Sequence, residues 1–199
     1  MRICFLPLIT SLVICLSVPV FGQSIHSFNS GMNCYGMWRL PDTGQTLSTT
    51  TTFGEDHDYQ PAATQPSYTI LNPVGISSVT LDNVTGLMWI TNPRTDAAMG
   101  GTYTWANALA ACEGKDYAGY SDWRLPNVLE LMSLYDFNAT SVPAIDTTAF
   151  PNTRVGFFWT STTYPVTPAN AMRVCTDQWA FIGNIVKTTV LYVRCVRGG

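Results

Sequence analysis

The stretch YSDWRLPN, residues 120–127, carries more structural information than any other part of the chain. It places a carboxylate, an indole and a guanidinium side by side, at Asp122, Trp123 and Arg124. One interpretation is a ligand site built on Asp122 and Arg124. The other is a buried ion pair or backbone clamp beneath Trp123 that locks the next helix to a sheet. We expect the structural role, because arginine satisfies carboxylates and carbonyls well in protein interiors.

Two segments with the apolar spacing of an α-helix flank this stretch, one after it and one before it. After Pro126 the spacing predicts a helix that ends at residues 136–138, with apolar positions at Val128, Leu131, Met132 and Tyr135. Upstream it predicts a helix over residues 104–113, between Thr104 as N-cap and Gly114. The apolar positions of that helix are Trp105, Ala108, Leu109 and Cys112, so its cysteine faces the core.

Short β-type runs surround the two helices. Residues 79–81 and 87–90 flank the turn-forming sequence DNVTG at 82–86, and together they predict a hairpin. A long loop is expected at 138–156. Beyond it, an antiparallel sheet that closes the chain is predicted from four runs: 157–162, 171–175, 179–183 and 189–196. In the last run, alternation places Val193 and Cys195 on the inward face. The sequence therefore predicts an α+β fold.

The first 22 residues have the pattern of a secretory signal peptide. Arg2 precedes an apolar run over residues 3–20, and Val20-Phe21-Gly22 supplies a cleavage site. The alternatives are a retained membrane anchor and a lipid anchor on Cys15. Two prolines in the run disfavour the first, and a bulky isoleucine before the cysteine disfavours the second. We expect export and cleavage after Gly22.

Composition narrows the classes of function. Only 12% of the residues are charged, against about a quarter in a typical soluble domain. The formal net charge is −3, or −4 once Arg2 leaves with the signal, so no nucleic-acid-binding surface is indicated. Residues 23–66 are rich in Ser, Thr and Gly, and we expect an extended N-terminal extension pinned to a domain over residues 67–199.

The cysteines point to an oxidising compartment. Four remain after the signal is removed: Cys34, Cys112, Cys175 and Cys195. An even number in an exported chain predicts two disulfides. No CxxC pair occurs, which argues against a zinc site or a thioredoxin-type redox site. Three arrangements of two bridges are possible, and sequence spacing alone does not choose among them.

Five ordered stretches resemble the Lcl C-terminal domain family, which is named for the C-terminal domain of a bacterial collagen-like adhesin. They are DNVTGLMW at 82–89, TWANAL at 104–109, YSDWRLPN at 120–127 with Glu130-Leu131, FWTST at 158–162 and VRCVRG at 193–198. Their order over residues 79–198 is specific, although each stretch alone is weak. Within them we expect structural roles for Trp89, Asp122, Trp123, Arg124 and Trp159.

The resemblance implies a C-type-lectin-like fold, in which two helices flank a small twisted antiparallel sheet and the chain ends come together. It also implies bacterial export and no established enzymatic activity. In the family pattern a cysteine at the end of the first helix pairs with one in the last strand, here Cys112 and Cys195. That pairing leaves Cys34 and Cys175 for a second bridge. The adhesin that names the family binds sulfated glycans, but the net charge gives no basis for transferring that ligand.

Catalytic and metal-binding residues are scarce. Only His26 and His57 remain after signal removal, and no nucleophile elbow, zinc-protease helix or phosphate loop is present. We therefore predict no enzymatic activity, no cofactor and no metal site. Glu55, Asp56 and Asp58 form an acidic cluster of the kind that calcium prefers, but their spacing is not that of an EF-hand. We expect a solvated acidic turn there.

Two functions remain, from different classes. The first is an exported binding module that recognises a glycan, peptide or surface polymer, with Tyr164, Asp177 and Trp179 as candidate contacts. The second is a structural or assembly component of the cell envelope that docks through its N-terminal extension. For either function we expect a periplasmic, outer-surface or secreted location. No nucleic-acid partner and no membrane-spanning segment in the mature form are expected.

Overall fold

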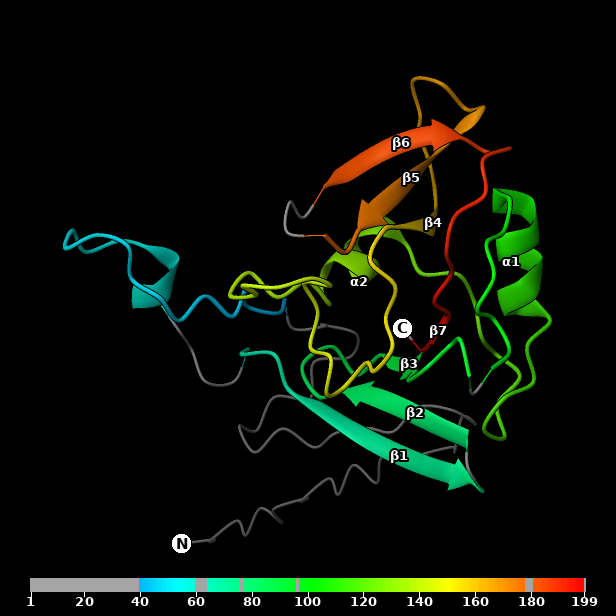
Figure 1. The fold of residues 1–199 in the computed structure, drawn as a ribbon, viewed down its shortest axis with the longest axis horizontal. Coiled ribbons are helices and arrows are strands. Elements are labelled where there is room, and N and C mark those ends of the chain that lie inside the picture. Colours follow the sequence, from blue (N-terminus) through cyan, green and yellow to red (C-terminus); the bar gives the residue numbers. More distant parts are fainter. Residues whose placement is uncertain (1–39, 60–63, 76, 96, 178–180, 199) are drawn as a thin grey trace, which may run out of the picture. The chain divides into compact units, whose positions relative to one another are not determined.

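The computed structural model describes residues 40–59, 64–75, 77–95, 97–177 and 181–198. These residues form two antiparallel sheets, two α-helices and a short 3-10 turn, Asp56–Asp58 (Figure 1). The fold class is α+β, as predicted. The predicted signal peptide, Cys34 and Trp179 lie outside the described residues.

The first sheet contains the predicted hairpin. Its strand order is β1 (Tyr68–Val74), β2 (Ser77–Asp82), β3 (Met88–Ile90) and β7 (Val196–Arg197). Strands β2 and β3 are antiparallel, with Val79 opposite Ile90. The Asp82 carboxylate holds the turn between them, because it accepts hydrogen bonds from the Val84 N–H at 2.9 Å and the Thr85 hydroxyl at 2.6 Å. The hairpin prediction is confirmed.

Strand β1 is absent from the sequence-based predictions. Its sequence, YTILNPV, lacks a clean alternation of apolar and polar side chains and contains Pro73, which has no backbone N–H to donate. The strand lies at the edge of the sheet, where a proline is tolerated. Its register against β2 shifts between Leu71 and Val74, next to this proline.

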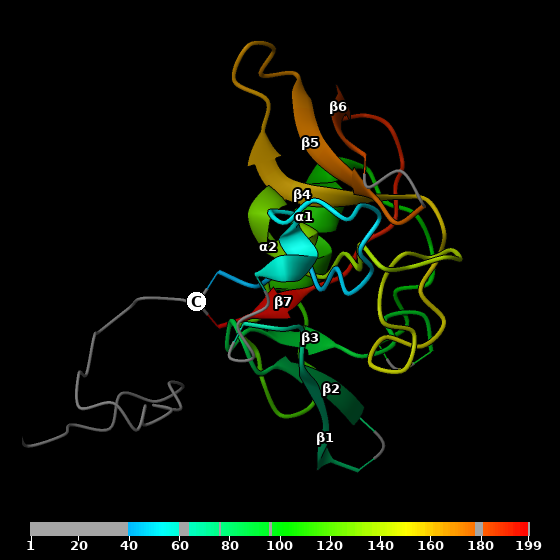
Figure 2. The same cartoon turned by 90° about the vertical axis from the view of Figure 1, so that its left-hand side faces the viewer.

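The second sheet has the order β4 (Phe157–Thr163), β5 (Asn170–Cys175) and β6 (Ile182–Val186), all antiparallel. The first two strands agree with the predicted runs at 157–162 and 171–175. The run predicted at 179–183 begins outside the described residues, and β6 continues beyond it to Val186. Figure 2 shows this sheet apart from the β1–β2–β3–β7 sheet.

The prediction that residues 189–196 form a strand of this closing sheet is wrong. Only the end of the segment is a strand, β7, and it pairs with β3 in the other sheet. Before that, Leu191 pairs with Tyr103 and Tyr192 forms a bridge to Phe158 of β4. The backbone groups of this segment are therefore satisfied by several separate partners, so it connects the two sheets instead of extending one.

Both predicted helices are present, but the second is shorter than expected. Helix α1 spans Trp105–Glu113, with Thr104 at its N-cap and Gly114 at its C-cap, as predicted. Helix α2 spans Val128–Met132 and does not reach Tyr135. Tyr135 instead pairs with Ile145, and its hydroxyl donates to the Asp177 backbone oxygen at 2.8 Å. These tertiary contacts replace the helical ones after the first turn and a half.

Two clusters of buried side chains hold the elements together. One joins α1 to the second sheet through Ala108, Trp123 and Trp159, and also contains Cys112 and Cys195. The other joins α2 to both sheets; its members include Trp89, Phe150, Phe158 and Leu131. Cys112 and Cys195 form a disulfide with Cα atoms 5.5 Å apart. The structure thus contains the bridge that the family resemblance implies, and it fastens α1 to the last segment of the chain.

Candidate binding surface on the second sheet

The YSDWRLPN stretch has a structural role in this fold. The Asp122 carboxylate accepts hydrogen bonds from Arg197 of β7 at 2.7 and 3.0 Å, and these bonds lower the pKa of Asp122. Arg124 forms a paired interaction with Glu130 of α2. Trp123 is buried, and its indole N–H donates to the backbone oxygens of Tyr117 and Tyr120. The motif therefore ties β7 and α2 to the loop between the helices.

The candidate contacts Tyr164 and Asp177 do not form one site. The Tyr164 N–H donates to the Asn170 backbone oxygen at 3.0 Å, which places it at the start of β5. Asp177 follows Cys175, the last residue of the same strand. The two residues thus lie at opposite ends of β5. Trp179, the third candidate, lies outside the described residues.

The acidic residues of the extension bond to their own loop. Glu55 accepts from the Thr49 N–H at 2.9 Å and from the Thr49 hydroxyl at 2.8 Å, and these bonds lower the pKa of Glu55. Asp58 accepts from the Gly54 N–H at 2.6 Å, and Asp56 accepts from the Thr43 hydroxyl. Within the described ranges, no three His, Cys, Asp or Glu side chains are grouped to hold a metal ion.

A cation and two aromatic rings meet on one face of the second sheet, at residues that the sequence analysis did not select. The Arg173 guanidinium on β5 lies 3.7 Å above the ring of Phe157 on β4. The ring of Phe181, just before β6, meets Phe157 edge-on with centroids 6.3 Å apart. Phe181 is 49% exposed, and the other two are half-buried. We call Arg173, Phe157, Phe181 and Gly183 the Arg173 surface.

Gly183 shapes this surface. It lies opposite Arg173 in the β5–β6 register. A Cβ atom at this position would lie 2.5 Å from Cε1 of Phe181, so the ring covers the glycine backbone. A larger residue would push Phe181 away from Phe157. The surface could have been suspected from Arg173, the single charged residue in the predicted run 171–175, but only the register places it beside two phenylalanines.

Arg173 carries a charge that no described acid neutralises. Its guanidinium forms no ion pair with a residue in the described part of the chain, and its buried Nε has no hydrogen-bond acceptor there. The face of an aromatic ring attracts a cation but leaves the N–H donors of the guanidinium free. The guanidinium of Arg173, which is half-buried, therefore keeps N–H donors that no described acceptor uses, beside rings that supply apolar contact.

A second cation lies in the turn that follows β6. The Lys187 ammonium sits 3.9 Å above the Trp105 ring and donates to the Thr163 hydroxyl at 2.9 Å. Lys187 follows directly after Val186, the last residue of β6, and is four positions after Gly183 in the sequence. Trp105 and Phe157 both pack against the same core cluster. The second sheet thus has two cation–ring pairs near it, Arg173 with Phe157 and Lys187 with Trp105.

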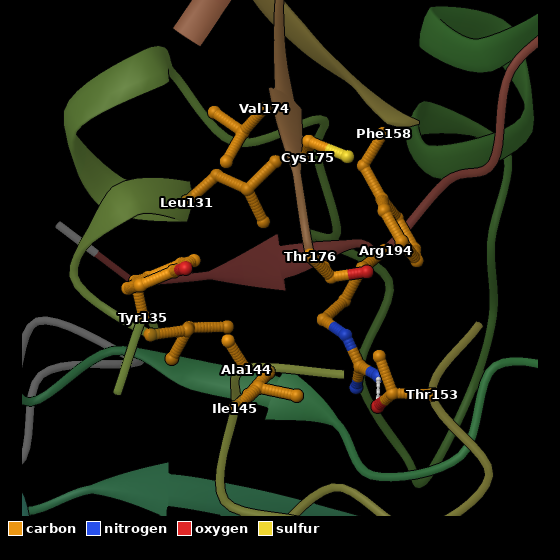
Figure 3. A pocket seen from close by; sticks show the side chains of 11 residues that line it. Leu131, Tyr135, Ala144, Ile145, Thr153, Phe158, Val174, Cys175, Thr176 and Arg194 are labelled. Carbon is orange, nitrogen blue, oxygen red and sulfur yellow. Dashed lines mark hydrogen bonds between the residues drawn. The ribbon is translucent and has the colours of Figure 1, made fainter. Parts of the chain in front are cut away.

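The cavity beneath this sheet is too small for an organic substrate. Figure 3 shows its lining, which includes Leu131, Tyr135, Phe158, the Cys175 thiol and the Arg194 guanidinium beside Thr153. The volume open to the centre of a water molecule is about 20 Å³, enough for one or two waters. Burial raises the pKa of Cys175, which forms no disulfide with a described residue. Because Cys34 lies outside the described residues, the second bridge stays a prediction.

Comparison with known protein families assigns most of this fold to one family. No curated protein matches the chain. The family model described as the Lcl C-terminal domain matches residues 78–197, a range that runs from β2 to β7. It contains both helices, the Cys112–Cys195 disulfide and all three strands of the second sheet. The chain therefore belongs to the Lcl C-terminal domain family.

Proposed function

We propose that this protein is a binding module that works outside the cytoplasm and contacts a glycan, a peptide or a surface polymer through the Arg173 surface. The observation that carries the proposal is a half-exposed Phe181 beside an arginine without a described acidic partner. Aromatic and arginine side chains dominate the energetic centres of binding interfaces. Membership of a family named for an adhesin supports a binding role.

The chemistry of the surface favours a ligand that combines oxygen acceptors with apolar faces. A guanidinium donates paired hydrogen bonds to carboxylate, carbonyl or hydroxyl oxygens. The ring of Phe181 offers apolar area at a small cost in conformational entropy. Lys187 and Trp105 repeat the same combination at the turn after β6. An extended ligand that touches both cation–ring pairs would use more of this chemistry than a small molecule would.

Export is supported by two independent features. Residues 3–20 form an apolar run behind Arg2 and before the site Val20-Phe21-Gly22. The Cys112–Cys195 disulfide also supports export, because disulfides are typical of oxidising compartments. Within the described residues, no helix is both long enough and apolar enough to cross a membrane.

A non-catalytic role is part of the proposal. The cavity beneath the second sheet, with about 20 Å³ open to water centres, is too small for a substrate and a reacting group together. His57, the one histidine in the described part of the chain, lies in the extension with its Nδ1 3.0 Å from the Asp58 carboxylate. A general base at the Arg173 surface would have to come from another side chain.

A second candidate function is assembly through the N-terminal extension. Four large apolar side chains of residues 40–59 are exposed: Leu40, Leu47, Phe53 and Tyr59. This segment is attached to the domain by Asn138, which accepts from the Thr46 N–H at 2.8 Å and donates to the Gly44 backbone oxygen. Exposed apolar groups on a short pinned segment are suited to docking on a partner protein.

Parallel binding screens test the two candidates. The exported protein is applied to glycan and peptide arrays and, separately, to envelope extract. We expect Arg173→Ala and Phe181→Ala each to weaken array binding by about tenfold or more. Leu129→Ala, which removes a 76% exposed side chain on α2, is the matched control and retains binding. The Arg173 proposal fails if the control loses as much affinity as the two surface variants.

The assembly function is supported instead if no array ligand binds and an envelope protein is captured by the wild type but not by the variants Leu47→Ser and Phe53→Ser.

A further inference from the structure

We infer that three arginines, Arg94, Arg154 and Arg194, form a binding pocket for a small tetrahedral oxyanion such as phosphate or sulfate. All three line one pocket next to β4, together with Asn152, Thr153 and Tyr192. No Asp or Glu is among the described residues that line it. None of these residues belongs to the Arg173 surface, so the inference is independent of the proposed function.

Arg194 supplies a buried and uncompensated positive charge. The residue is 2% exposed, and its Nη1 donates to the backbone oxygens of Ile90 and Thr91 at 2.8 and 3.1 Å. Its Nη2 donates to the Thr153 hydroxyl at 2.7 Å, the bond drawn in Figure 3, and its guanidinium lies 4.9 Å from the Phe150 ring centre. All of these partners are neutral. The charge is thus solvated by dipoles and not balanced by a described anion.

The charge on Arg194 persists at neutral pH. Burial lowers the pKa of Arg194 to about 9, because removal from water penalises the charged form. A cation that stays charged in the interior without an acidic partner is costly. Binding of an anion in the adjoining pocket would recover part of that cost, which gives the site a thermodynamic reason to attract one.

Arg94 and Arg154 add two positive charges at the rim of the same pocket. Both are exposed, and neither guanidinium forms a hydrogen bond or an ion pair with a described residue. The Arg154 guanidinium lies 5.9 Å from the Tyr192 ring centre. The stem of Arg94 covers Gly100, where a Cβ atom would be 2.9 Å from Cγ of Arg94. Gly100 therefore makes space for the arginine to lie along the pocket wall.

The size and donor set of the pocket favour a small oxyanion. The volume open to water centres is about 20 Å³, as in the cavity beneath the second sheet, so the pocket has no room for a sugar ring and would enclose only part of a small anion, beside the exposed Arg94 and Arg154. Donors come from three separate side chains, and a tetrahedral anion presents oxygens in more directions than a planar carboxylate does. Arginine is well suited to such groups because its N–H donors form paired bonds to phosphate-type oxygens. The shared chemistry is a phosphate or sulfate group, either free or at the end of a larger molecule.

Thermal unfolding and calorimetry of the exported protein test the inference, with sodium phosphate, sodium sulfate and sodium chloride at equal ionic strength. We expect a saturable rise in Tm with phosphate and sulfate but not with chloride, as a ligand that binds only the folded state produces. Because Arg94 and Arg154 are exposed, the double variant R94A/R154A should fold normally and lose phosphate affinity by about tenfold or more. R154A and R173A remove the same charge, but only R154A should weaken binding.

The outcomes distinguish binding at a specific site from general effects of salt on stability. Phosphate and sulfate also stabilise proteins by exclusion from their surface, without saturation. An equal rise in Tm for the wild type and R94A/R154A would therefore overturn the inference, as would equal losses in R154A and R173A. A phosphate monoester such as glycerol phosphate distinguishes the source. Affinity equal to that of inorganic phosphate supports recognition of a terminal group, whereas binding of the inorganic ion alone supports a site for the free anion.

Discussion

Arg124 and Glu130 hold each other through two hydrogen bonds, of 2.8 and 2.6 Å. Glu130 also accepts from the Asn127 N–H at 2.8 Å, which completes a capping box at the start of α2. Arg124 donates in addition to the Gly198 backbone oxygen at 2.7 Å. One arginine thus links the loop between the helices, the N-terminus of α2 and the end of the chain.

Replacing Glu130 by Gln should destabilise the protein at pH 7 by roughly 1.5–3 kcal/mol, the range for hydrogen bonds to charged groups. Burial alone would raise the pKa of Glu130, but hydrogen bonds from Arg124 and from the Asn127 N–H outweigh it, and the pKa lies below its usual value. The stabilisation is therefore complete above the unfolded-state value, about 4.3. It disappears as pH falls through the lower folded-state pKa.

Urea unfolding at several pH values checks this expectation. The difference in unfolding free energy between the wild type and Glu130→Gln should shrink as pH is lowered from 7 towards 3. Asp116→Asn, which alters an exposed carboxylate, is the control and should change stability little at either end. A difference that stays constant with pH would show that the ion pair contributes nothing.

Removing the Cys112–Cys195 disulfide should lower stability strongly. The bridge closes a loop with a sequence separation of 83, and its loss releases unfolded-chain entropy of roughly 4 kcal/mol in the chain-entropy model. Differential scanning calorimetry of the variant C112A/C195A should show a much lower Tm. Cys175→Ala removes a buried thiol without removing this bridge, and should cost less. A non-reducing peptide map that joins Cys112 to another cysteine would contradict the pairing.

The buried tryptophans should differ in their tolerance of phenylalanine. The Trp89 indole N–H is buried and has no acceptor among the described residues, whereas that of Trp159 donates to the Tyr103 backbone oxygen at 2.8 Å. Trp89→Phe removes an unsatisfied donor, but Trp159→Phe breaks a hydrogen bond. We expect Trp159→Phe to cost about 1–2 kcal/mol more in unfolding free energy. Chemical unfolding of both variants measures the difference, and the reverse order would refute it.

Replacement of the N-cap residue of α2 should have a smaller effect on stability. The Asn127 side chain accepts from the N–H groups of Leu129 and Glu130, both at 2.9 Å. Asn127→Ala should therefore cost about 1 kcal/mol, as loss of an N-cap usually does. Asn107→Ala, at an exposed position within α1, lacks this role and should be neutral or slightly stabilising. Equal losses of stability in the two variants would mean that the Asn127 cap makes no measurable contribution to the free energy of unfolding.

Local sequence patterns predicted the elements that are specified by a few neighbouring residues. The hairpin around residues 82–86 and helix α1 follow from turn residues and from helical spacing, both of which are local. The structural role of Asp122 and Arg124 was also expected, because arginine forms strong hydrogen bonds with carboxylates and carbonyls. Their partners, Arg197 and Glu130, were not named by any local pattern.

The candidate sites required the tertiary structure. Phe157, Arg173 and Phe181 are separated in sequence and meet only because β4, β5 and β6 pair in a particular register. Arg94, Arg154 and Arg194 converge from three loops for a similar reason. The sequence by itself determined the α+β class, the family and the residues able to form helices, turns and a disulfide. Long-range pairing decided which charged side chains meet an opposite charge and which stay uncompensated. Whether a charge is compensated depends on its burial and on neighbours that are distant in the sequence, so local sequence patterns do not predict it.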